Sequence, residues 1–452
     1  MLRKFILLFL LGIVNMSITN MIAKGTTYSF RLLSQTPGSG IRYVEGTPGY
    51  YLVEKTDTIS ADDSFKLDEG VYVRFVDGMS LVIEGEADFS LPEGKSTTLS
   101  AFNAVAMAKS IRISNTTGIE VRNVVFESIG LESMSKGAIV VENCQFIQHN
   151  GSSAAALYFL SEGKKSTISH CTFERCAKAA IGSAANVSQP LTISHCTLLC
   201  NSLNNQNIPQ INITASNLLI DSCTILGDST SLTSNNMVGG IGISNLLGYT
   251  DVDVTVSNCI IKHNRYGIGI VGPANVRIED NTITDNNHEA NPMNGGSGIS
   301  FYDPYAKATA VVARNTIEGN IWGVTIIGCK DVNLGQPQSS AVQSPGENHF
   351  SRNGYDGNRY DIYNNSTLTI YAQNNIWGVE HQTADEIEDV IFHQYDNSSL
   401  GEVIYMPAYD GNADISLPRI ETQSAAYTLQ GTRMNTPNRH GLYIQNGKKI
   451  IR

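Results

Sequence analysis

Titratable side chains that could carry out acid–base chemistry gather between residues 262 and 352. They are Lys262, His263, Arg265, Asp285, Glu289, Asp303, Glu318 and Arg352. Hydrolysis of a glycoside needs two carboxylates at a fixed separation. Elimination from a uronic acid needs a base, often Lys, Arg or His, and a cation such as Ca²⁺ or Arg that neutralises the sugar carboxylate. If the chain is an enzyme, we expect catalysis by His263, Arg265, Asp285 or Asp303. We expect no cofactor, with Ca²⁺ as an option only for elimination.

The spacing of these residues is not diagnostic of an enzyme. The motifs typical of polygalacturonases are absent, because the chain has no Asn-Thr-Asp, Gly-His-Gly or Arg-Ile-Lys, and its one Asp-Asp pair, Asp62-Asp63, lies far upstream. Charged side chains are mostly exposed and solvated in proteins. The sequence therefore favours binding over catalysis.

An internal repeat must position these side chains. Phrases such as SHCTF, DSCTI, EDNTI and ARNTI align in one column, with steps of 20 to 36 residues. The column consists of Val124, Cys144, Cys171, Cys196, Cys223, Cys259, Asn281, Asn315, Asn348 and Asn375. An apolar residue follows two positions later in every copy, and a second polar column, rich in asparagine, follows five positions later at Cys176, Asn201, Asp228, Asn264, Asn286, Asn320 and Asn353.

This repeat predicts an all-β protein, a right-handed parallel β-helix. Side chains alternate inward and outward along a short strand, and one coil buries its apolar face only by stacking on the next. Inward asparagines stacked at the strand spacing of about 4.8 Å can hydrogen bond to one another and to turn carbonyls. Leucine-rich and propeller repeats lack such a column. We expect one solenoid over residues 57–380.

The repeat resembles that of known β-helix families. The stretch YGIGIVGPANVRIEDNTITDNN (266–287) is similar to the pectin-lyase-like repeat and to the repeat of periplasmic copper-oxidase accessory proteins. The resemblance covers residues 110–380 and implies the fold. It implies no single function, because this fold carries many.

Four rings recur seven residues after the main column: Tyr266, His288, Trp322 and Tyr355. We expect them to stack at one turn and to bind a ligand, because a ladder of rings offers flat apolar faces of the kind that bind sugars. The alternative is a purely structural turn column. Insertions at 202–210, 229–238 and 287–297 leave just after this turn, and insertions on one edge of a solenoid often line a binding face.

Cysteines and histidines in the repeat are expected to be structural. Thiols stacked in register lie near the strand spacing, farther apart than a disulfide requires, so the column cysteines are read as apolar fillers. Cys176 and Cys200 come from adjacent coils near one turn and are the best disulfide candidates. His170 and His195 should stack, but their column is otherwise polar and outward, so we expect no metal site.

The two ends of the chain differ from the repeat. Arg3 and Lys4 precede an apolar run that ends near a small residue, Ala23, which predicts a signal peptide over 1–23 rather than a membrane anchor. An N-terminal cap is expected over 24–56 and a C-terminal cap, with a helix begun by a Thr383–Glu386 capping box, over 381–409.

A linker over 410–426 and a short β tail over 427–452 are expected to follow. The tail contains Leu429-Gln430-Gly431, Gly441-Leu442-Tyr443-Ile444 and a basic ending, and it resembles the sorting tails of the Bacteroidetes type IX secretion system. That resemblance implies delivery to the outside of the cell or to the outer-membrane surface. The alternative is a plain terminal hairpin.

Net charge and the distribution of apolar residues limit the classes of partner that we expect. The net charge is −11 and no basic run stands out, so we expect no nucleic acid partner, and no later segment is apolar enough to span a membrane. We expect an exported monomer that binds a polysaccharide or a cell-surface partner along one edge of the solenoid. The alternatives are a polysaccharide lyase or glycoside hydrolase with diverged catalytic residues, and a purely structural or adhesive surface protein.

Overall fold

The computed structural model describes residues 25–103, 110–160, 164–183, 190–214, 217–229, 236–249, 252–289, 291, 294–336 and 343–409, and four strands within 426–451. The predicted signal peptide and almost all of the predicted linker lie outside the described residues. The chain divides into one unit over 1–409 and a second over 410–452.

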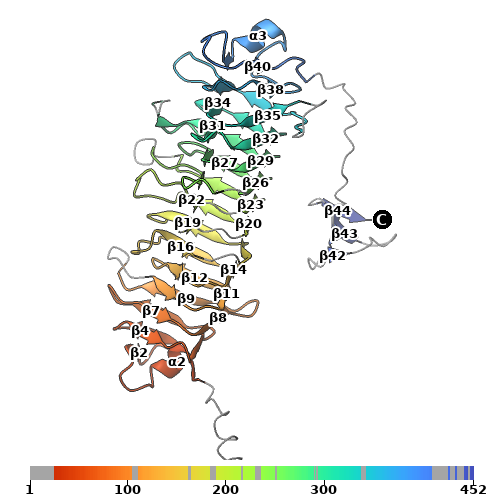
Figure 1. The fold of residues 1–452 in the computed structure, drawn as a ribbon. Helices are drawn as coiled ribbons and strands as arrows, with labels where there is room; N and C mark the ends of the chain where they lie inside the picture. Colours follow the sequence, from red (N-terminus) through yellow and green to blue (C-terminus); the bar gives the residue numbers. More distant parts are fainter. Residues whose placement is uncertain are drawn as a thin grey trace, which may run out of the picture. The chain divides into compact units, whose positions relative to one another are not determined.

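The first unit is a stack of coils whose strands form three long sheets (Figure 1). Sheet A is built, in spatial order, from β1 (Thr27–Tyr28), β5 (Ser64–Lys66), β8 (Glu86–Ser90), β11 (Gly118–Arg122), β14 (Ala138–Glu142), β17 (Ser166–Ser169), β20 (Leu191–Ser194), β23 (Leu218–Asp221), β26 (Asp253–Ser257), β29 (Asn275–Glu279), β32 (Thr309–Ala313), β35 (Asp331–Gly335), β38 (Ile370–Ala372) and β40 (Val403–Ile404). Sheet B is built from β2 (Ile41–Tyr43), β3 (Tyr50–Val53), β6 (Tyr72–Phe75), β9 (Thr97–Ala101), β12 (Val124–Glu127), β15 (Gln145–Ile147), β18 (Thr172–Glu174), β21 (Thr197–Leu199), β24 (Thr224–Leu226), β27 (Ile260–Lys262), β30 (Thr282–Thr284), β33 (Thr316–Glu318) and β36 (His349–Ser351). Sheet C is built from β4 (Asp57–Ile59), β7 (Leu81–Ile83), β10 (Ile111–Ile113), β13 (Leu131–Ser133), β16 (Ala155–Phe159), β19 (Ala179–Ser183), β22 (Ile211–Thr214), β25 (Ile241–Ser244), β28 (Ile268–Val271), β31 (Ser297–Tyr302), β34 (Trp322–Ile327), β37 (Ile362–Asn364) and β39 (Ile391–Phe392).

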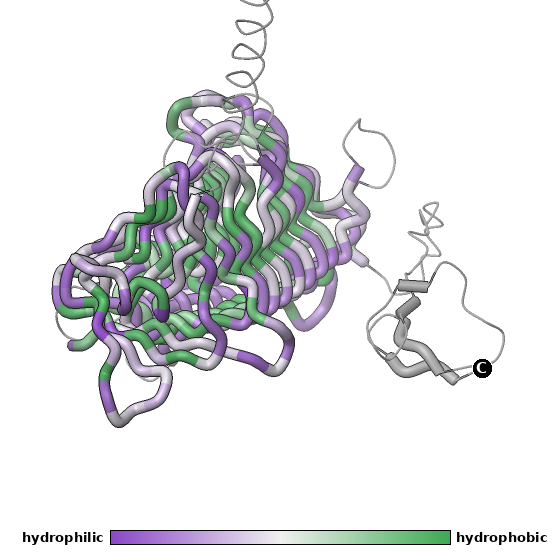
Figure 2. Tube along the Cα trace, turned by 90° about the horizontal axis from the view of Figure 1, so that it is seen from below, coloured by the Kyte–Doolittle hydropathy of each residue, from purple (hydrophilic) through white to green (hydrophobic). Residues whose placement is uncertain are grey.

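Each full coil contributes one strand to each sheet, and its strands pair in parallel with those of the coils above and below. Seen along the stack, the coils superpose (Figure 2). The pairing is in register, so that Ile278 of β29, for example, lies between Val256 of β26 and Val312 of β32. The predicted fold class, an all-β parallel β-helix, is confirmed. Among the described strands of this unit only β2 and β3 pair antiparallel, at the N-terminal end.

The interior is filled by columns of like side chains, as the repeat predicts. Phe126, Phe146 and Phe173 stack face to face, with ring centroids 4.6 and 4.8 Å apart. The main column is buried throughout: its cysteines and asparagines are at most 2% exposed. A residue with positive φ precedes most of its members, among them His170 and His195, whose rings stack 4.9 Å apart on the outside as expected.

The asparagines form two hydrogen-bonded ladders. In the main column, the amide of Asn281 donates to Asn315 at 2.9 Å, and the same contact continues through Asn348 to Asn375. The second ladder contains Asn201, Gln210, Asn264, Asn286, Asn320, Asn353 and Asp361. Each side chain donates to the next, and the last amide donates to a carboxylate. Buried amides are therefore satisfied along both turns, as burial of polar groups requires.

Two details of the predicted columns are corrected. Asp228 is not a member of the second ladder, because Gln210 reaches in from the preceding loop and joins Asn201 to Asn264. Cys176 and Cys200 are both free thiols. Cys176 points into the interior at the ladder position, whereas Cys200 occupies the positive-φ turn position and is half-buried, so their side chains do not face each other.

Short helices lie near both ends of the solenoid. At the N-terminal end, α2 (Phe30–Leu33) packs Phe30 against Phe65, with centroids 5.2 Å apart. At the other end, α3 (Ala384–Glu388) begins at Thr383, whose side chain accepts a hydrogen bond from the backbone of Glu386. The predicted capping residue is thus confirmed.

The second unit is a small antiparallel sheet of β42 (Arg433–Met434), β41 (Ala426–Tyr427), β43 (Leu442–Gln445) and β44 (Lys448–Ile451). No helix among the described residues is long and apolar enough to cross a membrane.

Candidate functional site

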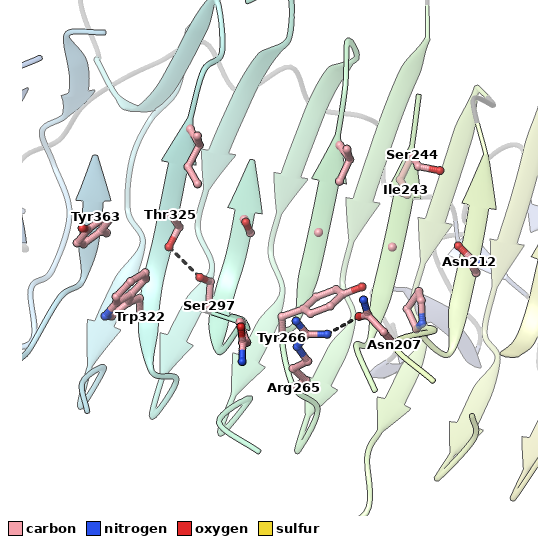
Figure 3. Close-up of a pocket in the computed structure, with 18 of the residues that line it drawn as sticks. Asn207, Asn212, Ile243, Ser244, Arg265, Tyr266, Ser297, Trp322, Thr325 and Tyr363 are labelled. Atoms are coloured by element: carbon pink, nitrogen blue, oxygen red, sulfur yellow. Dashed lines mark hydrogen bonds between the residues drawn. The ribbon is translucent and has the colours of Figure 1, made fainter. Parts of the chain in front are cut away.

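A groove of about 600 Å³ runs along the outer face of sheet C (Figure 3). Its floor is one row of outward residues in register on successive strands. The row is Asn212, Gly242, Gly269, Ser300, Thr325 and Tyr363, from β22 to β37. Because the middle of the row carries only small side chains, the sheet surface is hollowed there. The row spans five strand steps, about 24 Å, which is long enough for several sugar units.

Tyr266 lies in this hollow because glycine makes room for it. A Cβ atom at Gly239 would come within 2.1 Å of Tyr266 Cζ, and one at Gly269 within 3.0 Å of its Cε2. At Gly242 a Cβ would lie 2.6 Å from Pro209 and 3.2 Å from the phenol oxygen. Burial raises the pKa of Tyr266 to about 12, although the nearby Arg265 opposes the shift. The side chain is therefore a neutral phenol near pH 7, suited to donate a hydrogen bond rather than to accept a proton.

Arg265 brings a nearly buried positive charge to the same part of the groove. The residue is 9% exposed, and its guanidinium carbon lies 6.0 Å from the centre of the Tyr266 ring. One terminal nitrogen donates to Asn207 from the 202–210 insertion. The Nε atom is buried without a partner. Gly295 is required beside it, because a Cβ there would lie 2.7 Å from Nε.

An aromatic cluster, Trp322, Tyr360, Tyr363 and Phe392, stands at the C-terminal end of the groove. The rings of Trp322 and Tyr363 are parallel with centroids 4.3 Å apart, and Tyr363 stacks in turn on Phe392 at 4.4 Å. Tyr360 meets Tyr363 edge-on, at 5.5 Å. Such packing holds the rings rigidly and presents apolar surface beside polar groups, as sugar-binding sites do.

Carboxylates are absent from the described lining of the groove. The polar groups there are hydroxyls, amides and Arg265, including Ser297 and Thr325, whose oxygens lie 2.8 Å apart. Two facing carboxylates are what hydrolysis of a glycoside needs. The groove therefore does not fit that chemistry. Among the described residues no cluster of three or more His, Cys, Asp or Glu side chains could hold a metal ion.

The predicted site residues fall into two groups. Arg265, Tyr266 and Trp322 line the groove. His263, Asp285, His288, Asp303 and Tyr355 are not in its lining. Asp303 is buried and accepts hydrogen bonds from the backbone N–H groups of residues 305, 307 and 308, so its carboxylate holds a turn.

The expected single ladder of four rings is wrong. His288 stacks near His263, with ring centroids 6.3 Å apart, and Trp322 stacks on Tyr363 instead of Tyr355. Burial lowers the pKa of His288, and repulsion by His263 adds to the effect. The insertions after this turn differ in length between coils, so residues at equal sequence offsets do not reach equal positions. Tyr363 was missed for the same reason, because it lies outside the repeat phrase.

Comparison with solved structures finds similar folds at low sequence identity. A periplasmic alginate epimerase is 11% identical over 70% of this chain and 83% of its own, with a TM-score of 0.39. A family 6 polysaccharide lyase from Pseudopedobacter saltans is 14% identical over 78% and 89%, with a TM-score of 0.43. A mannuronic acid-specific family 6 lyase from human gut microbiota is 13% identical over 85% and 92%, with a TM-score of 0.33. No protein-family model and no curated protein matches the sequence.

Proposed function

We propose that this protein binds a polysaccharide lengthwise in the groove of sheet C. The observation that carries the proposal is the row of small residues that hollows the sheet between Tyr266 and the aromatic cluster. Rings, hydroxyls and amides provide the mixture of apolar faces and hydrogen-bonding groups that sugars match. The chain is expected to act as an exported monomer.

Retention of the full chain on immobilised polysaccharides tests this proposal. Alginate, polygalacturonate, dextran sulfate and dextran form the first panel. Replacement of Trp322 or Tyr363 with alanine should weaken binding about tenfold each, because a buried aromatic contact contributes on the order of 1–2 kcal/mol. The control is Tyr395→Ala, since that ring is 70% exposed and is not in the described lining of the groove. Equal retention of all three variants would reject the groove and leave a structural or adhesive protein.

Eliminative cleavage is the second candidate, because Arg265 and Tyr266 lie side by side in the groove. An arginine can neutralise a uronate carboxylate, and a neutral phenol can donate a proton to the departing sugar oxygen. A base must take the proton from the carbon beside the carboxylate, and the described lining holds no carboxylate or histidine for this role. The same polymers should then yield unsaturated ends, detected by ultraviolet absorbance, and Tyr266→Phe should abolish them. Absence of such ends with every polymer that the protein binds would reject this activity.

Export is supported by the basic and apolar N-terminal pattern, and the resemblance of the tail to sorting signals supports delivery to the cell surface. N-terminal sequencing of protein from the medium, periplasm and outer membrane tests both. Mature protein that begins near residue 24 is expected in the medium or on the surface. Full-length protein retained in the cytoplasm would reject export.

A further inference from the structure

The part of the groove above β31 is bounded on both sides by rings. Tyr266 covers Gly269 of β28 on one side, and Trp322 of β34 stands on the other (Figure 3). Strands β28 and β34 are two strand steps apart, about 10 Å, which leaves room for about one sugar ring. The floor here carries a hydroxyl pair, formed by Ser297 of β31 and Thr325 of β34. Each hydroxyl can both donate and accept, as sugar hydroxyls require.

The charge beside this stretch is uncompensated. In the described part of the chain, the Arg265 guanidinium has one hydrogen-bond partner, Asn207, and forms no ion pair. Burying a cation without a counter-charge costs several kcal/mol. This cation is kept in a chain of net charge −11 whose other groove residues are neutral. An anionic group of a ligand at the terminal guanidinium nitrogens would supply the missing charge.

We propose that the stretch above β31 is a subsite for one acidic sugar, whose carboxylate or sulfate is bound by Arg265 while its ring lies between Tyr266 and Trp322. The inference rests on the proposed function, since the acidic sugar is one unit of the bound polysaccharide. It adds a charge requirement at a single position. Neighbouring units then need no charge, because the described lining offers no second cation.

Matched polymers that differ only in charge test the subsite with the unmodified full chain. Polygalacturonate is compared with its carboxyl-reduced form, and dextran sulfate with dextran. We expect at least about tenfold tighter binding of one charged polymer than of its neutral partner, since hydrogen bonds to charged groups are stronger than those between neutral groups. The pair that shows the larger difference identifies carboxylate or sulfate as the bound group. Equal binding within both pairs would overturn the acidic subsite but leave the groove, whereas absence of all binding would overturn both.

Substitution of Arg265 by methionine locates the effect. This variant should lose the preference for the charged polymer and keep its affinity for the neutral one, and its melting temperature without ligand should be equal or higher because an unpaired buried charge is removed. The matched control is Arg277→Met, since Arg277 lies on sheet A and pairs with Glu279 at 2.6 Å. It should keep the preference. If Arg265→Met weakened binding of both polymers equally, Arg265 would merely hold the 202–210 segment, and the subsite would be overturned.

Discussion

A single buried carboxylate ends the second ladder. Asp361 is 1% exposed, accepts from Asn353 at 3.0 Å and from the backbone of Gly378 at 2.9 Å, and thereby gives the ladder an acceptor at its last step. Burial raises the pKa of Asp361 to about 6, since the two hydrogen bonds offset only part of the desolvation. The residue thus satisfies the last amide of the ladder at the cost of a buried charge above that pH.

We expect this residue to make stability depend on pH in an unusual direction. Because the folded pKa exceeds the unfolded value, the native state holds a proton that the unfolded chain has lost between about pH 4 and pH 6. The free energy of unfolding should therefore fall as pH rises through this window, by about 3 kcal/mol from this group. Chemical denaturation of the wild type and of Asp361→Asn at pH 4, 5, 6 and 7 measures this change in the free energy of unfolding.

The asparagine variant keeps one acceptor for Asn353 and cannot ionise, so its curve should lack the decrease. Asp88→Asn is the control and should follow the wild type, since the Asp88 side chain is half-exposed on the surface of β8. Parallel curves for wild type and Asp361→Asn would show that Asp361 keeps an ordinary pKa.

At the scale of the strands, glycines in β25 and β28 determine the depth of the groove. A valine at Gly242 would point outward, against Pro209 and the Tyr266 phenol. We expect Gly242→Val to weaken polysaccharide binding about tenfold or more because it fills the floor. Its melting temperature should also fall, because a Cβ there would lie 2.6 Å from Pro209, so that neighbouring atoms must shift. Affinity and thermal melting of the same samples check both, with Thr192→Val on the outer face of sheet A as the control. Unchanged binding by the valine variant would place the ligand elsewhere.

The elements show which properties the sequence could predict. The inward columns follow directly from strand alternation, so the burial of Cys196 or Asn315 was predictable. Gln210 and Asp361 were not, because they enter the ladder from irregular segments between strands. The lining of the groove depends on how far each insertion displaces the ring that follows it. This displacement separates Tyr266 and Trp322 from His288. It cannot be derived from sequence offsets within the repeat.

At the scale of the whole molecule, the solenoid must close its ends. Ile387 of α3 is fully buried among the last strands, and Trp377 stacks on Phe350 beneath them at 5.3 Å. An uncovered parallel edge offers unpaired backbone groups to other chains. We expect Ile387→Glu to cause loss of amide protection that begins at β37 to β40 and spreads toward β34, because each coil is stabilised by its neighbours.

Hydrogen exchange followed by mass spectrometry measures that order, and light scattering should show self-association of the variant. Asp385→Ala is the matched control, because Asp385 is an exposed residue of the same helix. Uniform loss of protection along the solenoid would instead indicate one cooperative unit.

The main column changes from thiols to amides between Cys259 and Asn281, where the backbone of Cys259 donates to the first asparagine at 2.9 Å. A coil that slipped one layer across this boundary would place a thiol where an amide oxygen accepts. Sulfur is the weaker acceptor, since the backbone N–H of Cys223 donates to Cys259 Sγ at 3.4 Å. Slippage among the five cysteines would exchange like for like. The boundary therefore fixes the number of coils between Cys259 and the C-terminal cap. On the cysteine side, gene duplication or deletion of one coil would leave the chemistry of the column unchanged.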